Sequence, residues 1–352
     1  MPLKRVIADV LGVATICLVS LLVLLGLYCI IYSLHFRKRV HGQGQFQLNY
    51  FAGPWIIRIV YILFAFWWGM GEIIRLNLFR HNGRALDALS LQWQENLCKC
   101  YVVSNLGFSE PCLFLTLIFL LRATVQSSGM LTRKWNWRTA GYVLAFCLPM
   151  LILQLLVILV GPKYKKELNP ELASYFIEAA SSPRFQEDEA AALCTYPLFS
   201  TIFLGFFATG STLYLFRLGR RILHLVINKG LQKRVYTLIL CISSSLPLRV
   251  LLLGLSVLSE PERLTFDAIS FLAFLCLVVC AGVAICVVVY LPIVDSLSLR
   301  TFYRSGHEYD GDALSMITNR GTLDGGDCSP SRASLNSAAM GSVSFRTTEA
   351  SE

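Results

Sequence analysis

Long apolar runs, separated by short polar stretches, dominate about the first 300 residues of the chain. Seven of them approach or exceed the roughly 20 residues that a helix needs to cross a hydrocarbon core of about 30 Å. They are Val10–Leu34, Pro54–Ile74, Cys98–Leu121, Thr139–Val160, Tyr196–Phe216, Val235–Leu258 and Phe266–Val294. The first run is longer than the apolar region of a cleaved signal peptide, which has about 7–15 residues. The pattern predicts an all-α fold, a polytopic bundle of seven transmembrane helices within residues 1–304.

The pattern ends at residues 305–352, which are rich in Ser, Thr and Gly and poor in large apolar side chains. Such a segment buries too little apolar area to offset the entropy of ordering it, so we predict a disordered tail. Ser329, which precedes Pro330, and Ser334, which follows Arg332 and Ala333, are possible phosphorylation sites. An unmodified, solvated tail is the alternative.

Composition supports the membrane interpretation. Of the 352 residues, 55% are hydrophobic and 15% are charged, and the mean hydropathy is +0.59. Soluble domains are about a quarter charged. The net charge of +9 arises from basic clusters between the apolar runs, where membrane proteins keep them. The expected partner is therefore the lipid bilayer of the plasma membrane or an endomembrane, and not nucleic acid.

The distribution of Lys and Arg among the loops predicts that the N terminus lies outside and the C terminus inside. One predicted cytoplasmic stretch is strongly basic and holds no acid. Its basic residues are Arg217, Arg220, Arg221, Lys229, Lys233 and Arg234. Apolar residues at helical spacing indicate a helix that continues from the fifth span. The stretch could bind cytoplasmic signalling or scaffold proteins, or anionic lipid; alternatively, it only orients the chain.

Three of the twelve cysteines suggest a disulfide. Cys98 and Cys100 begin the third span and Cys194 precedes the fifth, so all three would face the oxidising side. A bridge from Cys194 to Cys98 or to Cys100 would tie the loop between the fourth and fifth spans across the end of the bundle. Unpaired thiols are the alternative.

Ionisable residues inside spans are costly and normally face the bundle interior. Glu110 in the third span and Arg249 in the sixth lie roughly 18 Å and 14 Å from the outer ends of their helices. They could pair if those helices are neighbours, as a fixed clasp or as the latch of a two-state bundle. Arg58 and Glu72 lie in the second span, Arg58 near its inner end and Glu72 beside Arg75, and both are expected to be structural.

Pro247, two residues before Arg249, is a candidate hinge because its missing N–H frees the carbonyl of Ser243. Prolines are ordinary in membrane helices, so a hinge is not required here.

Nothing in the chain indicates an enzyme. It has no GxxxxGK[ST], HExxH or GxSxG motif, its five histidines fall outside the apolar runs, and no cluster has metal-ligand spacing. We expect no catalytic residue, no bound cofactor and no metal.

Two resemblances add to this interpretation. The layout of seven spans, with a possible disulfide and a Ser/Thr-rich tail, resembles G-protein-coupled receptors. The third span nevertheless ends in residues 120–124 (LLRAT) instead of Asp-Arg-Tyr, and the seventh ends without Asn-Pro-x-x-Tyr. More closely, the chain resembles a family of uncharacterised plant seven-span membrane proteins. The phrases that carry this likeness are residues 50–58 (YFAGPWIIR), 93–96 (WQEN), 104–112 (SNLGFSEPC), 193–198 (LCTYPL) and 231–238 (LQKRVYTL).

That resemblance implies a plant origin and a membrane location, and no activity. Three functions stay open at this point. The first is receptor-like signalling through the basic stretch and the tail. The alternative is a membrane scaffold that recruits cytoplasmic partners. A small-solute transporter with Glu110 and Arg249 along the path is a second alternative, disfavoured because the two halves of the chain show no internal repeat. The sequence does not indicate an oligomeric state.

Overall fold

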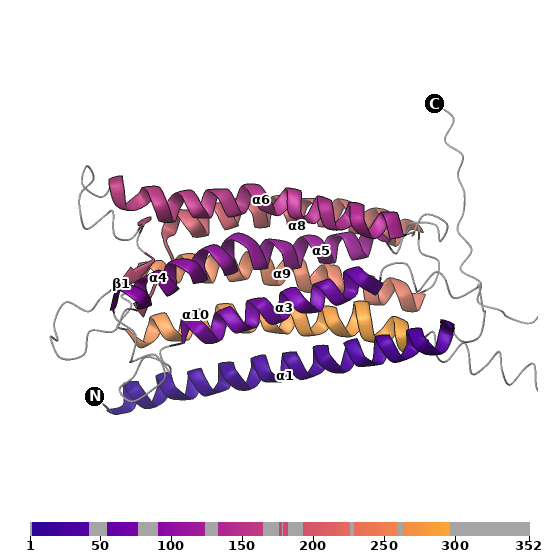
Figure 1. Cartoon of the computed structure of the whole chain (residues 1–352), viewed down its shortest axis with the longest axis horizontal. Helices are drawn as coiled ribbons and strands as arrows, with labels where there is room; N and C mark the ends of the chain where they lie inside the picture. The colour runs from indigo at the N-terminus through magenta and orange to yellow at the C-terminus, as the bar shows by residue number, and fades with distance from the viewer. Residues whose placement is uncertain are drawn as a thin grey trace, which may run out of the picture.

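The structure is a computed structural model that describes residues 2–41, 55–76, 91–123, 133–164, 176–177, 179–181, 193–225, 229–259 and 263–295. The described part is built from long helices that lie side by side along one axis (Figure 1). The helices are α1 (Pro2–His41), α3 (Trp55–Arg75), α4 (Leu91–Tyr101), α5 (Glu110–Ala123), α6 (Arg133–Tyr164), α8 (Leu198–Leu225), α9 (Lys229–Leu258) and α10 (Leu264–Ala284).

Seven helical spans within the described residues are long and apolar enough to cross a membrane, as the sequence predicts. They are Val6–His35, Trp55–Arg75, Gln92–Ala123, Trp135–Gly161, Leu198–His224, Lys229–Leu258 and Leu264–Asp295. Most extend beyond the apolar runs, because the flanking polar residues are also good helix formers. The architecture is that expected of a multi-pass membrane protein. The predicted tail, with Ser329 and Ser334, lies outside the described residues.

Two π-helical segments interrupt the regular helices. Segment η3 (Val102–Ser109) joins α4 to α5, and η5 (Ile285–Tyr290) follows α10. At the end of η3 the backbone N–H of Glu110 bonds the carbonyl of Asn105, five residues back. Pro111 follows and has no N–H to donate to the regular ladder, which favours the wider turn at this point.

The third span, which comprises α4, η3 and α5, is the central one. In its most apolar window 78% of the residues are buried, against 28% for the first, fourth and fifth spans. It contacts α3, α6 and α8, while α9 packs between α8 and α10, and α1 packs on α3 and α10. The apolar faces of the outer helices stay exposed, as lipid-facing surfaces would be.

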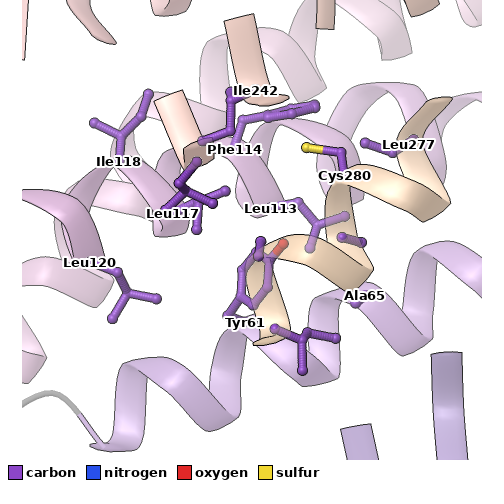
Figure 2. Close-up of a cluster of buried hydrophobic side chains, with 14 of the residues drawn as sticks. Tyr61, Ala65, Leu113, Phe114, Leu117, Ile118, Leu120, Ile242, Leu277 and Cys280 are labelled. Carbon is purple, nitrogen blue, oxygen red and sulfur yellow. The ribbon is translucent and has the colours of Figure 1, made fainter. Parts of the chain in front are cut away.

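Two large apolar clusters follow one another along the bundle, and a smaller third one contains Cys112, Val143 and Cys147. One of the large clusters contains Tyr61, Leu113, Phe114 and Ile242, drawn in Figure 2 together with residues of α10 such as Leu277 and Cys280. The other contains residues such as Leu106 and Leu252. Glu110 and Arg249 fall between these clusters along their own helices.

The two ends of the bundle differ. At the end where the chain begins, a short antiparallel pair joins β1 (Ala180–Ser181) to β2 (Leu193–Cys194) (Figure 1). We call it the disulfide end, for the bridge between Cys98 and Cys194. At the opposite end α8 finishes and α9 starts. We call it the basic end, for Arg217, Arg220, Arg221, Lys229 and Lys233.

Candidate functional site

The structure brings Glu110 and Arg249 together in the middle of the bundle. Nε of Arg249 donates to Oε1 of Glu110 at 3.0 Å, and Nη2 donates to the same oxygen. Nη1 donates to the carbonyl of Ala273 on α10 at 2.9 Å. Both charged side chains are almost fully buried, at 2% and 1% exposure. The helix adjacency that this pair requires is therefore present.

Glu72 completes the site, a role that the sequence does not indicate. Its Oε1 accepts from Nη2 of Arg249 at 2.9 Å, and its Oε2 accepts from Nε of Arg75 at 3.1 Å. We call Glu72, Arg75, Glu110 and Arg249 the charge network. The negative charges of its two carboxylates balance the positive charges of its two guanidinium groups. This pairing offsets the large free-energy penalty of burying each charge alone.

Aromatic rings surround the network. Nε1 of Trp68 donates to Oε1 of Glu110 at 3.2 Å, and the guanidinium of Arg249 lies 5.3 Å from the centroid of the same indole. Trp68 itself stacks on Phe274 of α10 at 5.5 Å. Such cation–π contacts strengthen where water is excluded. The rings therefore fix the orientation of Arg249 and keep the network dry.

Two tyrosines extend the network toward the disulfide end. The hydroxyl of Tyr101 donates to Oε1 of Glu72 at 3.1 Å and lies 3.0 Å from the hydroxyl of Tyr196. The guanidinium of Arg75 lies 5.6 Å from the ring centroid of Tyr196. Tyr196 precedes the fifth span (Leu198–His224), and burial raises its pKa to about 12, so the hydroxyl stays protonated at physiological pH. We call Tyr101 and Tyr196 the tyrosine pair.

The tyrosine pair lies directly beside the covalent bridge. Cys98 and Cys194 form a disulfide with a Cα–Cα distance of 5.1 Å, while Cys100 is free and exposed. Of the two pairings that the sequence leaves open, the structure has the one with Cys98. Because Tyr101 follows Cys98 by one helical turn and Tyr196 follows Cys194 by two residues, the bridge brings the two phenols together. That proximity is the signal that could have identified them.

A buried amide packs between the network and α3. Nδ2 of Asn105 in η3 donates to the carbonyl of Trp68 at 3.1 Å. The backbone of Gly71 lies so close to this amide that a Cβ there would be 2.5 Å from Nδ2 of Asn105. Gly71 therefore permits the close contact of α3 with η3 that brings Glu72 to Arg249.

The other predicted site residues lie away from the network. Arg58 is in the first turn of α3, at the end of that helix opposite Glu72. Pro247 is inside α9 with an exposed ring. The hydroxyl of Ser243 bonds the carbonyl of Ile239 at 2.7 Å. Ser244 and Ser245 likewise bond carbonyls of the preceding turn, so the serines stabilise the helix before the proline.

The basic stretch forms the ends of two adjacent helices. As expected, α8 continues to Leu225, and α9 starts at Lys229. Gly219 packs against Ile239, where a Cβ would approach to 2.6 Å, and Ile222 is fully buried. Arg234 differs from the other basic residues because both of its Nη atoms bond the carboxylate of Asp295, Nη2 at 3.3 Å.

The site is a buried network of ion pairs and hydrogen bonds. Among the described residues no group of three or more His, Cys, Asp or Glu could hold a metal ion. The charged atoms of the network bond one another rather than facing an open cleft. The arrangement holds α3, α5, α9 and α10 together through the side chain of Arg249.

Comparison with known proteins places the chain in a family but gives it no activity. No curated protein and no solved structure matches it. A family model described as "Uncharacterised conserved protein UCP031277" matches residues 1–305, and the matched segment includes the charge network, the tyrosine pair and the disulfide. The chain thus belongs to the UCP031277 family of uncharacterised conserved proteins.

Proposed function

We propose that the protein is a receptor-like multi-pass membrane protein, in which an event at the disulfide end changes the arrangement of the basic end. The observation that carries this proposal is the position of Arg249. This one side chain on α9 holds Glu110 and Glu72 of two other spans. Glu72 accepts in turn from Tyr101, whose hydroxyl bonds that of Tyr196 beside the disulfide.

The network has the asymmetry that a latch requires. Glu72 has two cationic partners, so it keeps Arg75 if Arg249 moves away. Glu110 would keep only the indole N–H of Trp68 among the contacts described above. A movement of Arg249 would therefore unpair Glu110 but not Glu72, and we propose that an event at the disulfide end selects between these two discrete arrangements, as switching elements do. Pro247, two residues before Arg249, is the proposed hinge.

The proposed orientation has the disulfide end outside, because disulfides persist on the oxidising side of a membrane. The basic end and the tail would then face the cytoplasm. Cytoplasmic signalling or scaffold proteins are the proposed partners there, with Ser329 and Ser334 as phosphorylation sites. The plant origin, the receptor-like layout and the location in a plasma membrane or endomembrane stay predictions.

The coupling between the two ends can be tested without knowing a ligand. The full chain is reconstituted in nanodiscs with spin labels on noncanonical amino acids at Arg122 and Lys229, which are exposed at the ends of α5 and α9. Electron–electron distances are measured before and after an impermeant reductant opens the Cys98–Cys194 bridge. We expect the distance distribution at the basic end to shift by about 2–5 Å, the range of known helix shifts and ratchets.

The matched variant is Arg249→Gln, in which the shift on reduction should disappear because the network no longer joins α9 to α3. If the distance between the two labels in the wild type does not change on reduction, the proposal is overturned in favour of a static scaffold. An equal shift in wild type and Arg249→Gln would mean that the ends are coupled by another route, and would remove the network from the mechanism.

A further inference from the structure

Three polar contacts join the third span to α3 at regular intervals. We call them the ladder. Its contacts are four residues apart on both elements and run in opposite directions along the chain. They are the hydroxyl of Tyr101 to Oε1 of Glu72 at 3.1 Å, Nδ2 of Asn105 to the carbonyl of Trp68 at 3.1 Å, and the hydroxyl of Ser109 to the carbonyl of Phe64 at 3.3 Å. The three donors therefore lie on one face of the third span, and the last two belong to η3.

A regular α-helix would not present Tyr101 and Glu110 on one face. Successive residues of an α-helix are turned by about 100°, so nine residues would leave these two about half a turn apart. In the structure both contact α3, because Tyr101 donates to Glu72 and Glu110 accepts from Trp68, one turn earlier. The wide bonding of η3 accounts for the difference. If its turns take up one extra residue, the angle between Tyr101 and Glu110 falls to about 80°.

The π-helical form of η3 is held in place from outside the segment. Among the described residues, the buried Oδ1 of Asn105 has no hydrogen-bond partner, and an unsatisfied buried acceptor is destabilising. The ladder offsets this on the side of α3. At the disulfide end, Cys98 lies three residues before Tyr101 and is bonded to Cys194 of β2, which pairs with β1. Because of this bond, α4 cannot turn about its axis without carrying β2 with it.

We propose that η3 is a two-state segment, which the Cys98–Cys194 bridge holds in the π-helical form and which becomes a regular α-helix when the bridge opens. The conversion releases the extra residue, so α4 turns by about 100° and moves by about 1.5 Å along its axis relative to α5. The hydroxyl of Tyr101 then leaves Glu72.

The trigger is a dithiol reductant at the disulfide end. Its two thiols become a disulfide as the S–S bond of the bridge breaks, and Cys98 and Cys194 each gain a hydrogen. This inference goes beyond the proposed function, because it concerns the third span alone and holds whether or not the basic end follows.

The rotation is measured on the full chain in nanodiscs, with spin labels on noncanonical amino acids at Asn96 of α4 and Leu159 of α6. Both positions are exposed. Electron–electron distances are recorded before and after the dithiol opens the bridge. We expect a shift of about 3–8 Å, because a side chain about 5–6 Å from the helix axis is carried through about 100°.

The matched variant is a deletion of Val103, which lies in η3 between Tyr101 and Asn105. Without the extra residue, η3 should be a regular α-helix while α4 keeps its phase. The variant should therefore fold with its bridge intact and show no shift on reduction.

Deletion of Leu115 is the control, because it lies in the regular helix α5, which has no extra residue to lose. This deletion turns buried side chains such as Leu117 and Leu120 away from the core. It should lower the melting temperature much more than the deletion of Val103 does.

Three outcomes would overturn the proposal. They are a wild-type distance between Asn96 and Leu159 that does not change on reduction, an equal shift in the variant without Val103, and equal losses of melting temperature in the two deletions. The labels at Arg122 and Lys229 separate this proposal from the proposed function. If only the Asn96–Leu159 distance shifts, the conversion stands and the coupling between the two ends fails. If only the Arg122–Lys229 distance shifts, the coupling stands and the conversion is wrong.

Discussion

Oε1 of Glu72 lies 2.9 Å from Nη2 of Arg249, although the two residues are separated by 177 positions in the chain. The same carboxylate holds Arg75 through its other oxygen. Glu72 therefore turns what would be a simple pair of Glu110 and Arg249 into a network of balanced charge. Any single neutralisation in it leaves an uncompensated charge in a dry interior.

Neutralising both partners should cost less than the sum of the two single neutralisations. Glu110→Gln or Arg249→Gln alone is expected to destabilise the protein by about 3–5 kcal/mol, because the partner charge stays buried without compensation. The double variant Glu110→Gln/Arg249→Gln should lose less than the sum of the two, since Glu72 keeps Arg75. Thermal unfolding of the detergent-purified protein measures each loss; strictly additive losses would contradict the pairing.

A charge swap is a stricter test of Glu72. Glu110→Arg with Arg249→Glu restores a pair between those positions but directs a second carboxylate toward Glu72. We expect the swap to recover less stability than the double neutralisation. Full recovery by the swap would mean that Glu72 does not contact position 249.

Removing the hydroxyl of Tyr101 should weaken the link to the disulfide end. Tyr101→Phe takes a donor from Glu72 and a partner from Tyr196, so we expect a loss of about 1–3 kcal/mol. Tyr196→Phe should cost less, because its hydroxyl reaches the network only through Tyr101. Tyr236→Phe, at an exposed position, is the control and should change the stability by less than about 0.5 kcal/mol. Equal effects in all three would contradict the hydrogen-bond chain.

Loss of either cysteine of the Cys98–Cys194 bridge should have the same effect on stability, and loss of Cys100 should have little. Cys98→Ser, Cys194→Ser and the double variant should destabilise equally, by about 2–5 kcal/mol, while Cys100→Ser should have little effect. In intact cells an impermeant maleimide should label Cys100 directly, and Cys98 and Cys194 only after reduction. Labelling of none of them would place the disulfide end on the cytoplasmic side, against the proposed orientation.

Gly71 should not tolerate a side chain. Its Cβ would collide with the amide of Asn105, so Gly71→Ala must displace either that amide or α3, at a cost of about 1–3 kcal/mol. Gly210→Ala and Gly254→Ala are controls, because a Cβ at either position would have no atom of a neighbouring element within 4 Å. Those two substitutions are expected to be neutral or to stabilise their helices by up to about 1 kcal/mol, as Ala normally does. A stable Gly71→Ala protein would contradict the close contact.

Pro247 can be tested separately from stability. Pro247→Ala returns an N–H to the carbonyl of Ser243 and should stiffen α9 without unfolding the protein. If Pro247 is the hinge, the shift between Arg122 and Lys229 on reduction should shrink while the melting temperature is kept or rises. An unchanged shift would exclude a hinge at this position.

The spans could be predicted from the sequence because crossing a membrane imposes a length and a polarity on each helix. The depth of a residue in the membrane could be predicted as well, since counting residues from the outer ends of their spans puts Glu110 and Arg249 at similar depths. The neighbours of a helix are not encoded in its own periodicity, so the contact of α9 with α3 and α5 required the structure. The sequence offers Arg75, one helical turn away, as a partner for Glu72. No residue near Glu72 in the sequence indicates that Arg249 is its second cationic partner.

The π-helical turn of η3 is another feature that the hydrophobic pattern of the sequence does not predict. It depends on Pro111 and on the packing of Asn105 against Gly71, which are compatible with an ordinary helix when read separately. The contact between the two tyrosines, in contrast, could have been predicted from the sequence. Once Cys194 is paired with Cys98, the positions of Tyr101 and Tyr196 relative to the bridge bring their rings together.

The wide separation of the network residues along the chain has a consequence for biogenesis. A ribosome delivers Glu72 and Glu110 to the membrane long before Arg249, which follows Glu110 by 139 positions. Until α9 inserts, the nascent protein holds one carboxylate, Glu110, without its cation, and the early helices cannot settle into their final register. We expect insertion chaperones to retain such intermediates, and quality control to degrade chains truncated before Arg249. Insertion of the sixth span is thus the step at which Glu110 gains its cation, and the seventh span then supplies the carbonyl of Ala273 to Arg249.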